Sequence, residues 1–415
     1  MKIGVAIFLG LCVSKLVNFL SQLLLTNSLS VETFGFYSLI ITTFSILAVV
    51  SSAGLHNGVI RYLSIESVER KISRNVLSIY HKVLFVGLIL SCASSVSLAL
   101  IAESISVFLI GNEGLSQSLK ICFVALPFSA VLMISSYFMR ARQVFWPEVL
   151  IRNILRSVVF LSSVGLLLLL GLSADEALFV AALVLSYVIA SILSLLAPMV
   201  YFRRVGAEKS PIFRISEFFK FSIYSILILV FYEGLLGSDK YAIAILMDDA
   251  NALGLYSGAS MVARQTEVFS IVILTIIAPK IASFPEFSDK LYNYVKTISI
   301  QIFPLAVALM IAVTAASPFI LGLLGPSYLE ARIEFLVLSL GFIFSSIITP
   351  VGAALQYTSG IRYEIFIMLL VMIVNLLLLY PAITFFGTLG AAISTTFALF
   401  LVGVMRSLSL QYLAR

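Results

Sequence analysis

Long apolar runs of about 20 residues or more dominate the chain, and short polar segments separate them. A run of this length crosses the roughly 30 Å hydrocarbon core of a bilayer as an α-helix, which rises about 1.5 Å per residue. A membrane barrel would instead show segments of about ten residues with alternating polarity. The pattern predicts an all-α membrane protein with twelve membrane-spanning helices, over residues 3–25, 35–57, 83–108, 119–139, 154–172, 177–201, 221–247, 254–279, 297–321, 334–356, 365–384 and 389–408.

The first apolar run follows Lys2 and could pass for a signal peptide. It does not stop at a small-residue cleavage site, because it continues through Lys15, Asn18 and Gln22 to Leu25. We therefore interpret it as a retained first span.

Composition supports a membrane protein and narrows its chemistry. Of the 415 residues, 61% are hydrophobic and only 11% are charged, whereas a soluble domain carries roughly 25% charged residues. The three cysteines fall in apolar runs without paired spacing, and there are only two histidines, so neither a disulfide framework nor a metal site is indicated. No catalytic residue, metal ligand or cofactor motif is predicted.

The lysines and arginines gather in the loops on one side of the predicted spans. That side holds 21 of the 26 basic residues, which by the positive-inside rule places both termini in the cytoplasm. The net charge of +6 thus reflects topology and does not indicate a nucleic-acid partner. No loop is long enough for a soluble domain, and the basic segment 202–219 divides the chain into two predicted six-helix lobes, residues 1–207 and 208–415.

The two predicted lobes share a sequence motif. Phe34–Ser38 (FGFYS) opens the second span and Leu253–Ser257 (LGLYS) opens the eighth, at an offset of 219 residues. The same offset relates Arg61 to Lys280, each at the cytoplasmic end of its span. Because six spans per lobe is an even number, the pattern predicts a parallel repeat about an axis along the membrane normal. Transporters built from such repeats hold substrate at the repeat interface.

Charged residues inside the seventh and eighth spans indicate a transport path. A charge at mid-bilayer depth costs at least ~2.5–3.5 kcal/mol, so it faces a protein interior or a wet cavity. Two alternatives stay open. Asp239 and Lys240 could form an interfacial pair near a shortened end of the seventh helix, and Arg264 and Glu267 could form a local i, i+3 ion pair in the eighth. The residues are Glu233, Asp239 and Lys240 in the seventh span and Arg264, Gln265 and Glu267 in the eighth.

A local ion pair between Arg264 and Glu267 would leave Gln265 as the free polar group of the eighth span. A buried carboxylate such as that of Glu233 tends to take up a proton. Glu233 is therefore a candidate for proton coupling.

The first two spans carry further candidates. Lys15, Asn18 and Gln22 fall at i, i+3 and i+7 on one helix face, which predicts either a cavity wall or a buried helix–helix contact. Arg61 lies at the cytoplasmic mouth of the second span. His56, one and a half turns before it, is interpreted as part of a solvated helix end, with contact to an anionic head group as the alternative.

Several motifs together resemble the polysaccharide-transporter (Wzx-type) flippases, a family in the superfamily that also holds multidrug-and-toxin-extrusion (MATE) antiporters and lipid II flippases. The resemblance covers essentially the whole chain. It is carried by Phe34–Ser38, Gly54-Leu55, Arg61-Tyr62, Asp239, Leu253–Ala259, Ala278-Pro279, Asn375-Leu376, Pro381 and Gly387–Thr396.

The resemblance implies a MATE-like fold in which the first, second, seventh and eighth spans line a central cavity. It implies a flippase of the bacterial inner membrane that moves undecaprenyl-pyrophosphate-linked oligosaccharides outward by alternating access, for O-antigen or capsule biosynthesis. Membrane lipids and other polysaccharide assembly proteins are its implied partners. We expect a substrate-binding cavity of Lys15, Asn18, Gln22, Arg61, Tyr256, Arg264 and Gln265, with Glu233, Asp239 and Glu267 as ion-coupling candidates.

Two other classes of function were weighed against this one. A cation-coupled multidrug exporter of the same fold is the alternative, although it would favour an acidic, aromatic cavity with little buried Lys or Arg. A membrane enzyme such as a polysaccharide polymerase needs a sizeable extramembrane loop with catalytic groups, and the loops here are too short. The sequence therefore predicts a transporter and not an enzyme.

Overall fold

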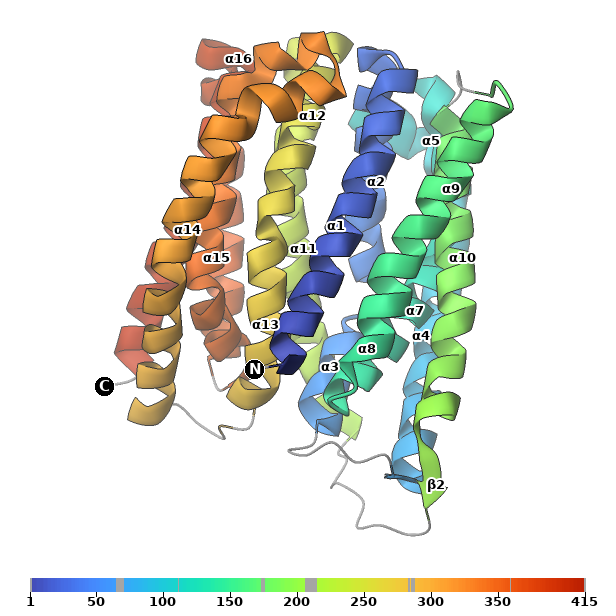
Figure 1. Cartoon of the computed structure of the whole chain (residues 1–415), viewed down its shortest axis with the longest axis vertical. Coiled ribbons are helices and arrows are strands. Elements are labelled where there is room, and N and C mark those ends of the chain that lie inside the picture. The colour runs from blue at the N-terminus through green and yellow to red at the C-terminus, as the bar shows by residue number, and fades with distance from the viewer. Residues whose placement is uncertain are drawn as a thin grey trace. The chain divides into compact units, whose positions relative to one another are not determined.

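The computed structural model of the protein describes residues 2–64, 71–110, 112–172, 176–205, 215–282, 284, 288–358 and 360–413. Nearly all of these residues are helical (Figure 1). One short pair of parallel strands, β1 (Lys71–Ser73) and β2 (Arg203–Val205), is an addition that the hydrophobic pattern did not predict. The predicted helical membrane fold is confirmed with this small exception.

Ten helices in the described part of the chain are long and apolar enough to cross a membrane. The number differs from the predicted twelve for two local reasons. The predicted span 254–279 is interrupted, because a single 3-10 turn, η4 (Arg264–Glu267), separates α12 (Ala250–Ala263) from α13 (Val268–Ala282). The last two predicted spans lie in one element, α16 (Ile361–Leu413), which bends at Gly387.

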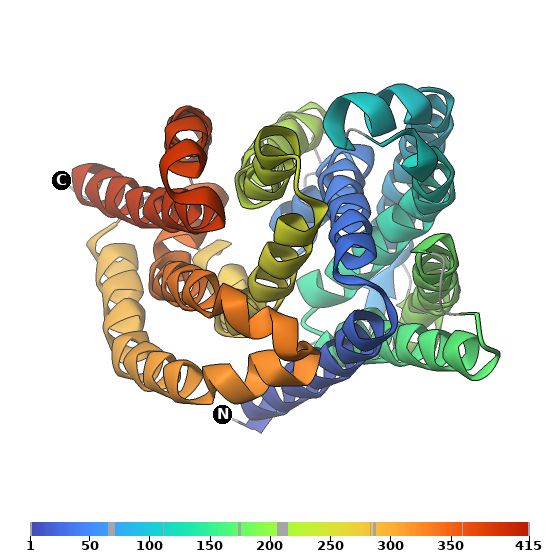
Figure 2. The ribbon, with the colours of Figure 1, turned by 90° about the horizontal axis from the view of Figure 1, so that it is seen from above.

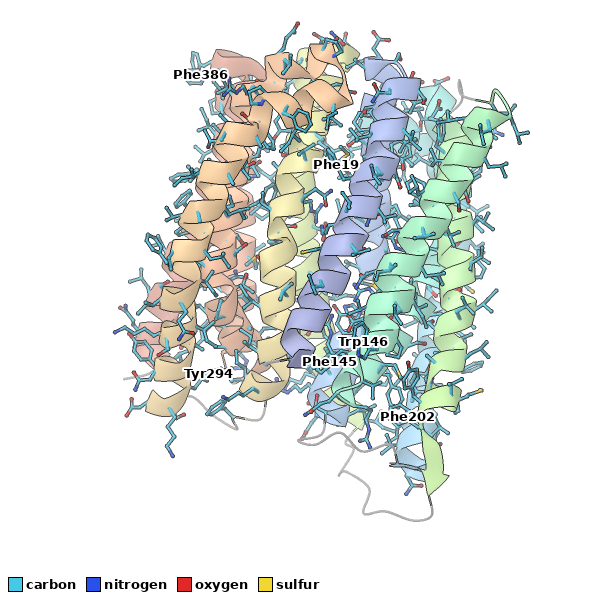
Figure 3. All side chains as sticks on the ribbon, in the orientation of Figure 1. Phe19, Phe145, Trp146, Phe202, Tyr294 and Phe386 are labelled. Carbon is cyan, nitrogen blue, oxygen red and sulfur yellow. The ribbon has the colours of Figure 1, made fainter. Side chains whose placement is uncertain are left out.

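Large apolar side chains cover the outward faces of these helices, as the side-chain view shows (Figure 3). Phe85, Leu169 and Phe319 are among the large hydrophobic residues that are well exposed in the structure. Soluble proteins rarely leave contiguous apolar surface in water, whereas a membrane protein presents such faces to lipid. The chain is a multi-pass membrane protein.

The described chain divides into two compact units. The N-terminal unit comprises residues 1–21, 43–106 and 113–230, and the C-terminal unit comprises residues 22–42, 107–112 and 231–415. The predicted lobe boundary between residues 207 and 208 lies outside the described residues and stays a prediction. Elements that contribute to both units are α1 (Lys2–Ser28), α2 (Val31–Ser51), the π-helical turn η1 (Ser106–Ile110) and α11 (Ile215–Met247).

A buried apolar and aromatic core holds the N-terminal unit together. Its central helix, α7, packs against α3, α4 and α10. Phe138 of α7 stacks on Tyr80 of α4 with 4.3 Å between ring centroids, and Phe202 meets Phe138 edge-on. The elements lying wholly in this unit are α3 (Leu55–Leu63), α4 (Arg74–Leu100), α5 (Ala102–Ile105), η2 (Glu113–Leu115), α6 (Ser116–Phe123), α7 (Ala125–Ala141), α8 (Phe145–Pro147), η3 (Glu148–Leu155), α9 (Arg156–Leu169) and α10 (Glu176–Tyr201), besides the two strands.

The C-terminal unit ends in a helical hairpin made by α16. The chain folds back at Gly387, where φ is 58°, and the two arms lie side by side (Figure 2). Polar contacts join the arms: Ser394 donates to the Asn375 amide oxygen at 2.8 Å, and Arg406 pairs with Glu364. The remaining elements of this unit are α12, η4, α13, α14 (Asp289–Leu324), η5 (Pro326–Ala331) and α15 (Arg332–Tyr357).

The two copies of the repeated motif meet inside the C-terminal unit. A Cβ atom placed on Gly35 of α2 would lie 2.9 Å from the backbone nitrogen of Gly254 in α12, and one placed on Gly254 would lie 2.0 Å from the carbonyl oxygen of Val31. Only glycine permits so close an approach of two backbones. These glycines are the pair that the 219-residue offset relates, so motif-equivalent positions contact each other.

Candidate functional site

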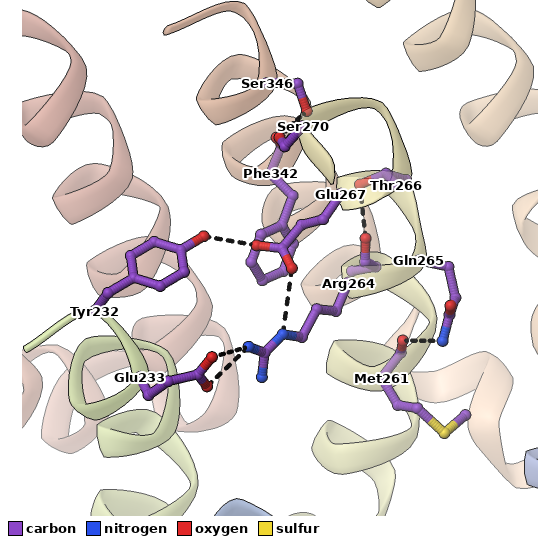
Figure 4. A network of polar contacts seen from close by, with 11 residues as sticks. Tyr232, Glu233, Met261, Arg264, Gln265, Thr266, Glu267, Ser270, Phe342 and Ser346 are labelled. Atoms are coloured by element: carbon purple, nitrogen blue, oxygen red, sulfur yellow. Dashed lines mark hydrogen bonds and ion pairs between the residues drawn. The ribbon is translucent and has the colours of Figure 1, made fainter. Parts of the chain in front are cut away.

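A network of charged side chains lies near the middle of α11 and at the interruption between α12 and α13 (Figure 4). The Arg264 guanidinium donates two hydrogen bonds to the carboxylate of Glu233, at 2.9 and 3.0 Å, and a third to Glu267 at 3.3 Å. The Tyr232 hydroxyl donates to the other oxygen of Glu267 at 2.8 Å. One guanidinium is therefore shared by two carboxylates.

The local ion pair expected between Arg264 and Glu267 is present, but it is only half of the arrangement. The sequence spacing could not show that Glu233, on the preceding helix, also pairs with Arg264. Within this group of three the charge sums to −1. Arg264 can therefore bind a further anion only if one of its carboxylates is displaced or neutralised.

Gln265 stands next to this network with its amide only partly satisfied. Its nitrogen donates to the Met261 carbonyl at 3.4 Å, whereas its buried Oε1 has no hydrogen-bond partner among the described residues. Buried polar atoms normally have hydrogen-bond partners, so this amide oxygen is an exception among buried groups. The assignment of Gln265 to a substrate-binding cavity stays a prediction.

The 3-10 turn η4 is a feature that hydrophobic periodicity missed. It consists of four consecutive polar residues, Arg264 to Glu267, and interrupts an otherwise regular helical path. A 3-10 stretch within a helix often marks a hinge, and transporters commonly place substrate or ions at such interruptions. The run of four polar residues was the available signal in the sequence.

A second polar cluster lies one and a half turns further along α11. Asp239 is only 1% exposed; it accepts a 2.6 Å hydrogen bond from the Tyr256 hydroxyl and a weaker one from Thr395. The Lys240 ammonium donates to Ser38 at 2.9 Å. Because α11 continues to Met247 and Asp239 is buried, an interfacial pair at a shortened helix end is wrong.

Tyr256 occupies a different position from the one expected of a sugar-contacting residue. It is completely buried, and its hydroxyl is committed to Asp239. In this conformation Tyr256 positions the Asp239 carboxylate and does not present its hydroxyl to an open surface. A contact with sugar would need this hydrogen bond to break.

The first-span candidates are distributed over both units. Lys15 and Asn18 belong to the N-terminal unit and Gln22 to the C-terminal unit. All three are half-buried, and the Asn18 amide donates to the Ser14 carbonyl of its own helix at 3.0 Å. Ser14, beside Lys15, approaches Ser157 of α9 at 3.4 Å, so this helix face packs against the fifth predicted span.

Arg61 lies on α3 in the N-terminal unit, beyond the end of the α2 span. Its guanidinium stacks on the Phe221 ring at 4.5 Å from the centroid and borders Tyr62. Burial lowers the pKa of Arg61, which the nearby Tyr62 and Glu217 partly oppose. The predicted place at the mouth of the path stays a prediction.

Three cationic side chains and one imidazole have positions that the sequence interpretation did not anticipate. Arg152 lies just before the predicted span 154–172 and Arg156 at its start, but the structure begins this span at Phe145, so both arginines lie well within it. Arg140 is buried at the end of α7. His56 is 1% exposed, so the solvated helix end assigned to it is wrong.

No group of three or more His, Cys, Asp and Glu side chains could hold a metal ion in the part of the chain that the structure describes. The polar clusters are instead cation–carboxylate networks.

Solved structures identify the fold of this chain. The chain is similar to the lipid II flippase MurJ in an inward closed conformation, with a TM-score of 0.74 and 14% identity over 98% of this chain and 87% of that one. It is also similar to an inward-facing MATE-family multidrug resistance transporter of the MOP superfamily, with a TM-score of 0.71 and 13% identity over 96% and 94% of the two chains. At these identities the likeness shows the fold, which is that of MOP-superfamily transporters.

A third structure with this fold is a MOP-superfamily transporter from Pyrococcus furiosus Vc1 (DSM3638), which is described by the reverse polarity of its binding pocket. The TM-score is 0.59 and the identity 12%, over 99% of this chain and 93% of that one. No curated protein matches the sequence significantly.

The family model described as "Polysaccharide biosynthesis protein" matches residues 2–290. The chain belongs to this polysaccharide biosynthesis protein family, as the motifs indicated.

Proposed function

We propose that this protein is a flippase of the bacterial inner membrane that moves undecaprenyl-pyrophosphate-linked oligosaccharide repeat units to the outer leaflet. The product would serve O-antigen or capsule biosynthesis. The observation that carries the proposal is the position of Arg264, a cation in the interruption of a membrane helix, within a chain of the polysaccharide biosynthesis family. A permanent guanidinium suits a pyrophosphate because it forms bidentate hydrogen bonds with phosphoryl oxygens.

Twelve membrane crossings in two six-helix lobes are part of the proposal. The interrupted path of α12, η4 and α13 would form one crossing, and the two arms of α16 would form two. The contact between Gly35 and Gly254 supports a pseudo-two-fold axis, because equivalent residues can touch only near the axis that relates them. Both termini would then lie in the cytoplasm, and rocking of the lobes would alternate access.

Proton uptake would give this mechanism its coupling step. Glu233 and Glu267 hold Arg264 in the observed state, and protonation of either carboxylate would release guanidinium N–H groups toward a phosphate. Lys15 and Arg61 would supply further positive charge, while Asn18, Gln22 and Gln265 would contact the sugars. Asp239 would act as a third ion-coupling group, positioned by Tyr256.

Deletion of the gene in its own host tests the proposal. We expect the lipid-linked repeat unit to accumulate in the inner leaflet and surface glycan to disappear, because synthesis on the cytoplasmic side continues without export. A plasmid copy of the wild-type gene should restore the glycan. Intact glycan without such accumulation would contradict the proposal.

A cation-coupled multidrug exporter is the second candidate, and the excess of carboxylates around Arg264 favours it. Such an exporter would exchange protons or sodium ions for organic cations at the acidic groups. Increased sensitivity of the deletion strain to cationic drugs, with surface glycan unchanged, would select this function instead.

A further inference from the structure

A cluster of arginines and aromatic rings lies inside the N-terminal unit, away from the residues considered so far. The guanidinium groups of Arg140 and Arg152 lie 4.6 and 5.1 Å from the ring centroid of Tyr137. The His56 ring packs edge-on against the same tyrosine at 4.7 Å. One turn further on, Arg156 lies 5.0 Å from the ring centroid of Tyr187.

Glu148 is the carboxylate that forms ion pairs in this cluster. Both of its oxygens accept hydrogen bonds from Arg140, one of them at 2.8 Å, and Arg152 pairs with it at 3.2 Å. Arg156 donates to the backbone carbonyl of Arg152 at 3.3 Å. Within the described ranges no carboxylate lies at ion-pair distance from Arg156. Glu148 therefore pairs with two of the three arginines, and the charge of these four residues sums to +2.

This excess charge lies inside a membrane-spanning segment. The span Phe145–Leu169 begins beside Trp146, which is 47% exposed and of the residue type that marks membrane interfaces (Figure 3). Arg156 follows Trp146 by ten residues, which at helical rise is on the order of 15 Å along the helix. An arginine at such a depth requires a counter-charge or a wet surface.

The geometry leaves donors available for an anion. A guanidinium stacked on an aromatic ring uses its face and keeps its N–H groups at its edge for hydrogen bonding. Arg152 is 24% exposed and Arg156 is half-buried, and residues spaced i, i+4 lie about 6 Å apart on a helix. The segment that carries Glu148 and Arg152, η3, is π-helical, a geometry frequent at functional sites.

We infer that Arg156 and Arg152 form a phosphate-binding subsite that takes the pyrophosphate group of a polyprenyl-linked substrate. Two guanidinium groups one turn apart match two linked phosphoryl groups, while Arg140 and Glu148 hold Arg152 in position. The lipid-linked nature of the ligand rests on the proposed function; the phosphate chemistry follows from the cluster alone.

Calorimetric titration of the purified full-length protein in nanodiscs tests the inference, with inorganic pyrophosphate and farnesyl pyrophosphate as probes. Arg156→Gln should weaken binding of both probes at least about 10-fold, because one bidentate guanidinium contact is lost. Arg156→Lys should recover part of the affinity, since it keeps the charge. Arg362→Gln, which removes an exposed arginine from the first turn of α16, should bind like the wild type.

The two probes distinguish the sources of the phosphate. Equal affinity for both supports a subsite that recognises phosphate alone, and tighter binding of farnesyl pyrophosphate supports a lipid-linked ligand. No binding of either probe to the wild type, or unchanged binding to a folded Arg156→Gln protein, overturns the inference. Unchanged thermal unfolding and gel-filtration profiles identify the folded variant.

Failure of the inference and failure of the proposed function give different results. If the deletion strain shows no leaflet accumulation but Arg156→Gln lowers pyrophosphate affinity, the subsite stands and the flippase assignment falls. If accumulation occurs and Arg156→Gln binds pyrophosphate normally, the flippase stands and the subsite falls.

Discussion

Two regions hold arginines within membrane-spanning segments: the Arg264 network of the C-terminal unit and the cluster around Tyr137 in the N-terminal unit. They differ in the balance between arginines and carboxylates. Arg264 is shared by Glu233 and Glu267, so carboxylates exceed cations. In the N-terminal cluster Glu148 serves Arg140 and Arg152, and cations exceed carboxylates. An arginine that is paired with carboxylates becomes available to an anion when a carboxylate takes up a proton. An arginine in excess over carboxylates can bind an anion without this step.

This comparison separates two tasks that a transporter of a charged lipid has to combine. Binding an anion needs uncompensated positive charge, and releasing it needs a group whose charge changes. The Arg264 network has titratable carboxylates and the N-terminal cluster has stacked arginines. Substitutions in the two regions should therefore differ in kind as well as in size.

The largest expected effect is the loss of export on substitution of Arg264. Arg264→Ala should abolish surface glycan at unchanged expression, because it removes the cation and leaves Glu233 and Glu267 without their counter-charge. Quantitative immunoblotting of surface glycan measures the effect. Lys15→Ala should have the same outcome, and wild-type glycan from either variant would remove that residue from the mechanism.

A charge swap separates the structural role of Arg264 from its role in transport. Glu233→Arg combined with Arg264→Glu recreates an ion pair between the same positions. We expect the double variant to fold but to remain inactive, because position 264 then carries the wrong charge for a phosphate. Export at the wild-type level by the swapped protein would show that the pair is only structural.

The next largest effect is on stability, in the N-terminal cluster. Glu148→Gln keeps the side-chain volume but removes the carboxylate charge that pairs with Arg140, whose side chain is 6% exposed. Loss of one partner of a buried ion pair costs about 3–5 kcal/mol. SDS titration in mixed micelles should show a loss of unfolding free energy of this size, and a loss below about 1 kcal/mol would contradict burial of the pair.

A smaller effect is expected at the contact between the repeated motifs. Gly254→Ala would place a methyl group 2.0 Å from the Val31 carbonyl oxygen, and such overpacking costs about 1–3 kcal/mol. Gly165→Ala is the matched control, because nothing lies within 4 Å of its added methyl group and alanine is the better helix former. Equal thermal stability of the two variants would argue against the close contact.

The smallest effect is expected from the exposed pair of Glu103 and Lys120. Their side chains are 76% and 44% exposed, and a surface ion pair of this kind contributes about 0–1 kcal/mol. Glu103→Gln should therefore leave the unfolding free energy within about 1 kcal/mol of the wild type in the same SDS titration. A loss comparable to that of Glu148→Gln would mean that burial does not govern these pairs.

Hydrophobic runs predicted the membrane helices well because spanning a bilayer imposes a length and a polarity on each helix. They could not show that Arg264–Glu267 forms a 3-10 turn, because four polar residues between two apolar runs fit a continuous helix as well as an interrupted one. The tight connection after Ala141 was also missed, because the predicted spans 119–139 and 154–172 leave a loop of arginine-rich sequence between them, whereas the structure starts the next span at Phe145. Charge density alone does not distinguish a loop from a cationic helix face.

The sequence predicted which residues belong to the candidate site, but not which of them contact each other. Glu233, Asp239, Arg264 and Glu267 stand out because each interrupts an apolar run. Their partners lie far away in sequence, as with Thr395 near Asp239 and Ser38 near Lys240, and only the folded chain brings them together. One sequence contains no signal for such tertiary contacts.

Transbilayer movement of the native substrate in proteoliposomes tests the central claim most directly. Lipid-linked repeat unit extracted from the deletion strain would be reconstituted with purified protein, and its accessibility to an external glycosidase followed over time. We predict that wild-type protein makes the inner-leaflet fraction accessible, whereas Arg264→Ala protein matches protein-free vesicles. Equal rates for wild-type and protein-free vesicles would contradict the assignment of this chain as a flippase.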